Sequence, residues 1–150
     1  MNKNRNANEL TAELKRILQK LLAEHPAVLS AYLFGSAAQG FARVTSDIDV
    51  AIRVDEALPT ETCFALRIRL IEELERHFGK KVDVVVLNNA SLRMINQVLA
   101  NGKLVLATDL EQELDYHVQK QKEFFDFKYY IDMDIKETER YFGLSNGNRS

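Results

Sequence analysis

The sequence predicts an α/β (α+β) fold, in which a small mixed β-sheet is flanked by helices and followed by a C-terminal helical segment. Short apolar runs rich in Val, Ile and Leu alternate with longer segments whose apolar residues recur at helical spacing. Gly, Pro and Asn residues separate these segments, where turns are expected. With 150 residues, of which 46% are hydrophobic and 28% charged, the chain suits one domain with its own core.

The predicted elements follow one another with short connections. Leucines at helical spacing predict a first helix that has Asn8 as its N-cap and stops before Pro26. The other predicted elements are strands over 28–34, 47–54, 82–87 and 103–107 and helices over 60–78 and 92–101. Together with the first helix, these elements make up the unit that spans residues 1–108 of the chain.

The C-terminal segment differs in composition from this unit. Residues 109–142 contain no Pro or Gly, which predicts a long helix or two, and the apolar residues between Phe124 and Ile135 occupy more than one helical face. One face is expected to pack against the domain itself. Because a small sheet cannot cover the rest, we expect a protein partner or self-association there. Residues 143–150 are predicted to be a disordered tail.

The central motif lies between the first two predicted strands. Gly35-Ser36 ends one apolar run, and after ten residues Asp47-x-Asp49 opens the next. On a strand, Asp47 and Asp49 project from the same face, where their like charges repel unless a cation neutralises them. Hard cations such as Mg²⁺ take oxygen ligands of this kind, so the pair predicts a magnesium site. The alternative is a solvated turn followed by an edge strand with two surface aspartates.

The Gly-Ser half of the motif suits a phosphate. Gly35 permits a tight turn and a close backbone approach, and Ser36 can cap a short helix over 37–40. The free N–H groups and the positive dipole end of such a helix attract anions. A phosphate-binding turn beside a metal site is what nucleotide chemistry requires.

A third carboxylate interrupts the apolar run over 82–87. Asp83 is the one acid in that run, and a lone buried carboxylate is costly. It therefore needs a partner, a cation or a strand end that solvent reaches. Its alternative interpretation is a surface acid at the strand edge.

Other features exclude several classes. A net charge of −2 disfavours broad contact with nucleic acid, and the single cysteine, Cys63, rules out an internal disulfide. No run reaches membrane-spanning length, so we expect a cytoplasmic protein. Walker-type, zinc-ligand and Gly-x-Ser-x-Gly patterns are absent from the sequence. His77 and His117 have no catalytic companion in the sequence and are interpreted as surface or packing residues.

The spacing of Gly35-Ser36 and Asp47-x-Asp49 resembles the signature of the DNA polymerase β-like nucleotidyltransferase superfamily. Up to about Thr108, the chain resembles in particular the minimal nucleotidyltransferases (MNT) that are antitoxins of HEPN-domain toxins. The resemblance implies a nucleotidyltransferase domain over 1–108 and an extension over 109–142, which either completes the domain or binds the partner.

The resemblance also implies residue roles. Asp47, Asp49 and Asp83 would bind two Mg²⁺ ions, with Asp83 also acting as general base. Gly35 and Ser36 would hold the β- and γ-phosphates of ATP. The AMP moiety would pass to a tyrosine hydroxyl of the HEPN toxin and neutralise it.

One departure and two alternatives accompany the resemblance. Many relatives carry arginines just after Gly-Ser, where this chain has Ala37, Ala38 and Gln39, and Arg43 is the candidate to compensate. The first alternative is an aminoglycoside-type nucleotidyltransferase with a separate substrate-binding subunit. The second is a non-catalytic antitoxin that acts by binding alone.

Overall fold

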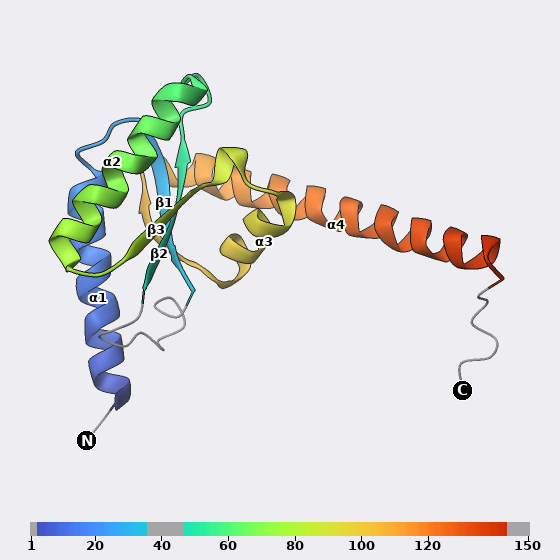
Figure 1. Cartoon of the computed structure of the whole chain (residues 1–150), viewed down its shortest axis with the longest axis horizontal. Coiled ribbons are helices and arrows are strands. Elements are labelled where there is room, and N and C mark those ends of the chain that lie inside the picture. Colours follow the sequence, from blue (N-terminus) through green and yellow to red (C-terminus); the bar gives the residue numbers. More distant parts are fainter. Residues whose placement is uncertain (1–2, 36–46, 144–150) are drawn as a thin grey trace.

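The computed structural model describes residues 3–35 and 47–143 (Figure 1). The helices are α1 (Lys3–Leu22), α2 (Thr60–Phe78), α3 (Leu92–Asn101) and α4 (Leu110–Tyr141), with a 3₁₀ turn η1 (Leu87–Asn89). The strands are β1 (Val28–Phe34), β2 (Ile48–Val54), β3 (Val82–Val86) and β4 (Lys103–Ala107). The predicted α/β architecture is confirmed. Within the described ranges, no helix is both long and apolar enough to cross a membrane.

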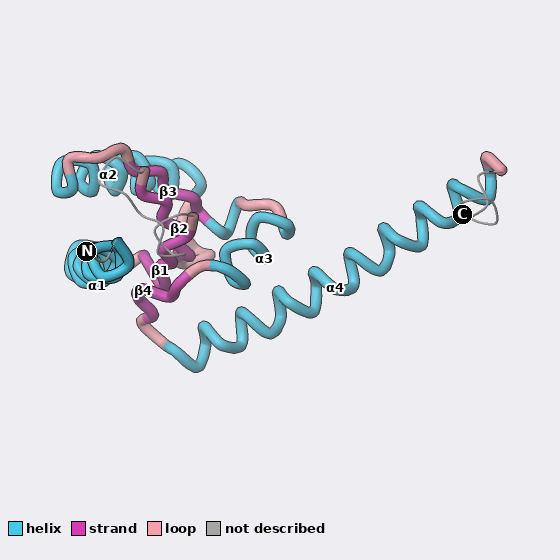
Figure 2. The backbone as a smooth tube through the Cα atoms, turned by 90° about the horizontal axis from the view of Figure 1, so that it is seen from below, coloured by secondary structure: helices cyan, strands magenta, loops and turns pink. Residues whose placement is uncertain are grey.

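The four strands form one mixed sheet in the order β3-β2-β1-β4. β2 pairs with β3 in parallel, whereas β1 pairs with β2 and β4 in antiparallel fashion. Figure 2 shows α1 and α2 on one side of the sheet and α3 and α4 on the other. The sheet is therefore covered on both faces, which explains why its central strands are almost continuously apolar.

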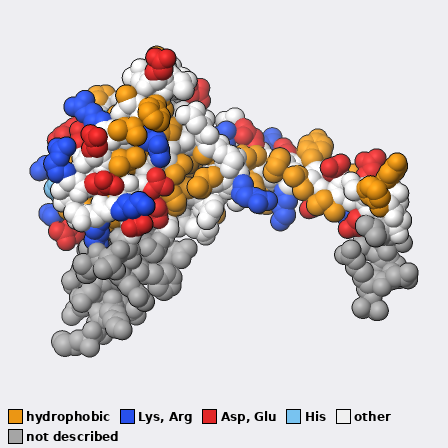
Figure 3. All heavy atoms as spheres, in the orientation of Figure 1, with side chains coloured by type: hydrophobic (Ala, Val, Ile, Leu, Met, Phe, Trp, Pro, Cys, Tyr) orange, Lys and Arg blue, Asp and Glu red, His pale blue; other side chains and the backbone are white. Residues whose placement is uncertain are grey.

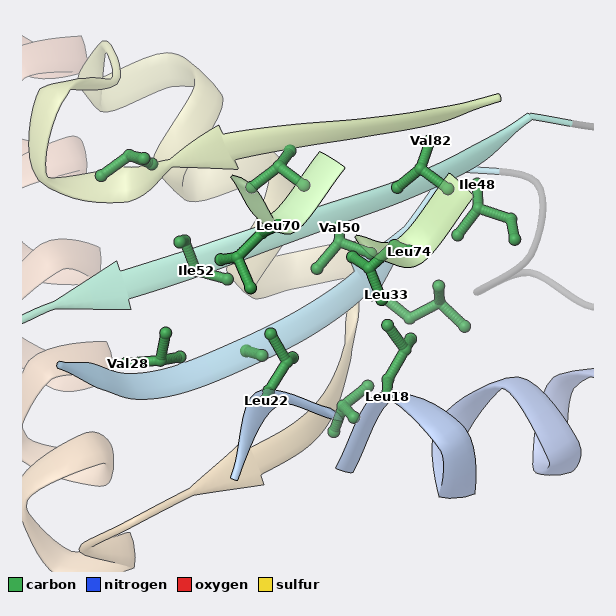
Figure 4. Close-up of a cluster of buried hydrophobic side chains, with 14 of the residues drawn as sticks. Leu18, Leu22, Val28, Leu33, Ile48, Val50, Ile52, Leu70, Leu74 and Val82 are labelled. Carbon is green, nitrogen blue, oxygen red and sulfur yellow. The ribbon is translucent and has the colours of Figure 1, made fainter. Parts of the chain in front are cut away.

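The main core lies between the sheet and the first two helices (Figure 4). α1 contributes Leu14, Leu18 and Leu22, which recur every four residues and so form one stripe. Ile48, Val50 and Ile52 of β2 alternate toward this core. Since side chains alternate along a strand, Asp49, Ala51 and Arg53 point to the opposite face, which α3 and α4 cover.

Three predicted boundaries are wrong. α1 begins at Lys3 rather than after Asn8, because no Gly or Pro near the start breaks the helix. Asp47 precedes β2, which begins where the N–H of Ile48 donates to the Lys81 carbonyl. β3 ends at Val86, and the chain turns directly into η1.

α4 is a single helix of 32 residues, roughly 48 Å long at 1.5 Å per residue. The Asp109 side chain caps it by accepting a hydrogen bond from the N–H of Gln112 at 3.1 Å. Its first half lies against the α3 side of the sheet, and its second half projects away from the rest of the described structure (Figures 1 and 2). We call residues 124–141 of α4 the arm.

Candidate functional site

Two of the predicted site residues lie side by side on the sheet. Asp49 of β2 and Asp83 of β3 are direct partners in the parallel register. Both point away from the face that α1 and α2 cover, because the residues flanking each of them belong to that core. The Asp83 side chain is 54% exposed, and Asp49 is partly buried. Of the three possibilities expected for Asp83, two are found: solvent reaches its side chain, and Arg67 of α2 is a protein partner.

The surroundings of Asp49 are electrostatically unfavourable to its charge. Burial raises the pKa of Asp49 above its usual value, and the charges of Asp83 and Asp47 raise it further. Asp47 itself is exposed just before β2, so it approaches the pair without belonging to the strand. A cation placed among these carboxylates would relieve the repulsion, and carboxylate oxygens fit a hard divalent ion such as Mg²⁺.

The three carboxylates predicted to bind metal are not gathered in a ligating arrangement. Considering only residues 3–35 and 47–143, no group of three His, Cys, Asp or Glu side chains is close enough to hold a metal ion. Asp83 instead lies 3.5 Å from the guanidinium of Arg67 on α2, measured from Oδ1 to Nη2. The donor types therefore fit the cation, while one of the three carboxylates has a protein partner.

The turn after β1 approaches one of these carboxylates, that of Asp49. Gly35 has a φ of +71°, a left-handed conformation that favours glycine, and a Cβ built on it would collide with Oδ2 of Asp49. The tight turn predicted for Gly35 is thus present, and it lies against Asp49, whereas its close approach to a ligand stays a prediction. Ser36, the helix predicted over 37–40 and Arg43 lie outside the described residues.

A second polar cluster lies on the same face of the sheet and was missed in the sequence. Glu113 of α4 is 1% exposed, and its Oε2 accepts hydrogen bonds from Nε and Nη2 of Arg53 at 2.9 and 2.5 Å. Its Oε1 accepts from the hydroxyls of Ser30, at 2.7 Å, and Tyr32. The buried carboxylate is therefore fully hydrogen-bonded, as a buried charge must be.

His117 extends this cluster. Its Nε2 lies 2.6 Å from the Tyr32 hydroxyl oxygen. Because the single hydroxyl proton of Tyr32 is donated to Glu113, His117 must donate its Nε2–H to that oxygen. The packing role expected for His117 is found, with a specific partner. Burial raises the pKa of Tyr32 and lowers that of His117, so both groups are held neutral.

The sequence does contain signals for this cluster. Arg53 is a charged residue in the apolar second half of its strand, and such a charge needs a partner. Glu113, Tyr116, His117 and Lys120 also recur at helical spacing, which marks one helix face.

Comparisons with known proteins bear on the family and the fold of the chain. Residues 16–111, more than half of the chain, match the family model "Polymerase beta, Nucleotidyltransferase". The chain is 32% identical over 99 residues to Protein adenylyltransferase MntA of Shewanella oneidensis, covering 66% of this chain and 68% of that protein.

Two solved structures share the fold over most of their length. A toxin–antitoxin crystal structure with AMP-PNP has a TM-score of 0.67 at 28% identity, covering 83% of this chain and 97% of the matched chain. A structure of tri-AMPylated Shewanella oneidensis HEPN toxin in complex with MNT antitoxin has a TM-score of 0.64 at 25% identity, covering 85% and 98%.

Proposed function

Because the chain belongs to the polymerase beta family of nucleotidyltransferases, we propose that it transfers AMP from ATP to a tyrosine hydroxyl of a HEPN-domain toxin and so neutralises that toxin. The similarity to MntA and to toxin–antitoxin structures supports this acceptor over a small molecule such as an aminoglycoside. We assign the reaction to the cytoplasm, in keeping with the single cysteine.

One observation carries the catalytic part of the proposal. Asp49 and Asp83 are register partners across β2 and β3, and Asp49 lies directly against the Gly35 turn. In the proposal, Asp47, Asp49 and Asp83 hold Mg²⁺, and the turn with Ser36 holds the β- and γ-phosphates. A divalent cation bound there supplies charge stabilisation for the triphosphate.

The transfer is an in-line displacement at the α-phosphorus of ATP. A bond forms between the tyrosine oxygen and the α-phosphorus while the bond from that phosphorus to the leaving oxygen breaks, and pyrophosphate leaves. The phenolic proton passes to Asp83, which is exposed enough to reach an acceptor on another protein.

The arm is the proposed docking surface for the toxin. The face of α4 that packs on the domain through Glu113 and His117 continues along the helix as Phe124 and Phe127. Large exposed side chains of the arm, coloured orange in Figure 3, are Phe125, Phe127, Tyr129, Tyr130, Ile131, Met133, Ile135 and Tyr141. Such a series of apolar side chains is typical of a protein interface. We therefore propose that the functional division of the chain lies near Phe124, within the extension predicted over 109–142.

The catalytic proposal is tested by mass spectrometry of the neighbouring HEPN protein after incubation with the chain, ATP and Mg²⁺. We expect one AMP adduct per modified tyrosine with the wild type and none with Asp47→Ala or Asp49→Ala. Asp115→Asn removes an exposed acid of α4 and is the matched control, which should retain transfer. Full transfer by either of the first two variants would disprove the assignment, and toxin neutralised without any adduct would favour the non-catalytic antitoxin.

The docking proposal is tested by replacing Phe124, Phe127 and Tyr130 with serine. Interface aromatics are worth about 2 kcal/mol each, so affinity for the toxin should fall more than about 100-fold even without additivity. Phe64→Ser on α2 removes a 61% exposed aromatic from the body of the domain and should leave affinity unchanged. Titration calorimetry measures both, with a circular dichroism melt as folding control. Unchanged affinity in the folded triple variant would place the toxin elsewhere.

A further inference from the structure

Arg67 of α2 is tied to both the backbone and the third carboxylate of β3. Its Nε–H donates to the Val84 carbonyl oxygen at 2.6 Å, and its Nη2 lies 3.5 Å from Oδ1 of Asp83. The guanidinium is planar and rigid, so the first contact fixes where its second nitrogen lies. The backbone carbonyl of Val84 therefore holds the Arg67 guanidinium in place beside Asp83, in addition to the carboxylate itself.

The sheet order makes this contact possible. Val84 packs in the core toward α2, whereas Asp83 points to the other face. β3 is the edge strand beside β2, so a side chain from α2 can pass around its outer edge and meet Asp83. Asp83 then lies between the guanidinium on the outer side and its register partner Asp49 on the inner side.

We propose that Arg67 is a positioning residue for Asp83: it holds Oδ1 against the repulsion from Asp49, so that the Asp83 carboxylate would be oriented to help hold the divalent cation. The inference rests on the proposed function, because it concerns the metal site of that reaction. Groups that orient metal ligands typically change metal affinity by about 10–100-fold. Arg67 also repels the cation, but its side chain is 35% exposed, so solvent and salt screen that repulsion.

The test measures Mn²⁺ binding to the full chain without nucleotide, by titration calorimetry. Arg67→Gln should weaken binding by about tenfold. Arg67→Lys should also weaken it, because an ammonium group cannot contact the Val84 carbonyl and Asp83 with the same fixed geometry. In transfer assays, Arg67→Gln should raise the metal concentration needed for half-maximal rate more than it lowers kcat at saturating metal.

Arg69→Gln is the matched control. Arg69 lies on the same helix, is largely exposed and pairs with Glu73, so this variant changes the net charge equally without touching Asp83. Its Mn²⁺ affinity should equal that of the wild type. If Arg67→Gln unfolds, the Mn²⁺ affinity of Arg67→Lys decides the question. A wild-type affinity in Arg67→Lys then overturns the proposal.

Asp83→Asn separates this inference from the proposed function. Weaker Mn²⁺ binding in Asp83→Asn together with unchanged or tighter binding in Arg67→Gln overturns the role of Arg67 and leaves the metal site standing. If Asp83→Asn leaves the Mn²⁺ affinity unchanged, the metal site itself is overturned, and the positioning role of Arg67 falls with it.

Discussion

Carboxylates lie at both ends of β2, on the same face of the sheet, but their surroundings differ in charge and in hydrogen bonding. At the first end, Asp49 faces Asp83 and is near Asp47, and the pKa of Asp49 is raised. At the other end, roughly 13 Å along the strand, Arg53 and two hydroxyls satisfy the buried Glu113. The chain supplies every partner at the Glu113 end, whereas at the Asp49 end three carboxylates come together and Arg67 pairs with only one of them.

This difference separates structure from function. A buried charge with all its hydrogen bonds made holds α4 on the sheet, and removing one partner leaves the others uncompensated. Carboxylates that repel one another do not stabilise the fold, and in the proposed function a divalent cation would offset their charge. Substitutions at the two ends should therefore act on stability and on activity, respectively.

The largest expected effect is at the buried end. Glu113→Gln should lower the free energy of unfolding by about 3–5 kcal/mol, because the guanidinium of Arg53 stays buried without its counter-charge. Urea denaturation measures this change. Glu111→Gln in the same helical turn removes an exposed acid and should change stability little. A loss below about 1 kcal/mol for Glu113→Gln would mean that the cluster does not anchor α4.

The second effect belongs to the acidic end. Asp83→Asn should reduce kcat for AMP transfer by about 100-fold or more, since a general base acts on the chemical step. Nucleotide affinity, measured by calorimetry with a non-hydrolysable ATP analogue, should change far less. Unchanged turnover with weakened nucleotide affinity would reassign Asp83 to binding.

A smaller effect is expected from Gly35→Ala, which forces a Cβ against Asp49 and strains a positive φ. We expect stability to fall by about 1–2 kcal/mol, with a loss of Mn²⁺ affinity as Asp49 is displaced. Gly79→Ala is the control for backbone strain alone, because Gly79 has a φ of +63° and open space around its Cβ position. Equal effects of the two variants on Mn²⁺ affinity would contradict the contact between the turn and the metal site.

The smallest effect is a pH dependence at the buried end. Burial lowers the pKa of His117 below its usual value of 6.5, so the unfolded chain binds this proton more readily than the folded one. The resulting stability is present above about pH 6.5 and is lost as pH falls through the lower, folded-state pKa. Comparing urea midpoints at about pH 7 and pH 5, wild type should lose more stability than His117→Gln. If wild type and His117→Gln lose the same stability between these pH values, His117 does not cause the pH dependence of stability.

Part of the fold and of the site could be predicted because it depends on neighbours in the chain. The alternation of Ile48, Val50 and Ile52 with Asp49 follows from the two-residue period of a strand, and the arm's excess of apolar faces follows from the helical period. The prediction that Asn8 is the N-cap of the first helix was wrong. A residue that can cap a helix also fits inside one, and nothing before Asn8 interrupts this helix.

What the sequence by itself determined is therefore the set of groups: a glycine turn, an Asp-x-Asp pair, a third aspartate in an apolar strand and an aromatic helix. Only the tertiary structure decided which of them meet. The register that places Asp83 opposite Asp49, the route of Arg67 around the edge strand, and the choice of Glu113 among the acids of α4 as the partner of Arg53 all join residues distant in sequence or on different elements. Such pairings depend on sheet order and on packing around the core, and no local periodicity encodes them.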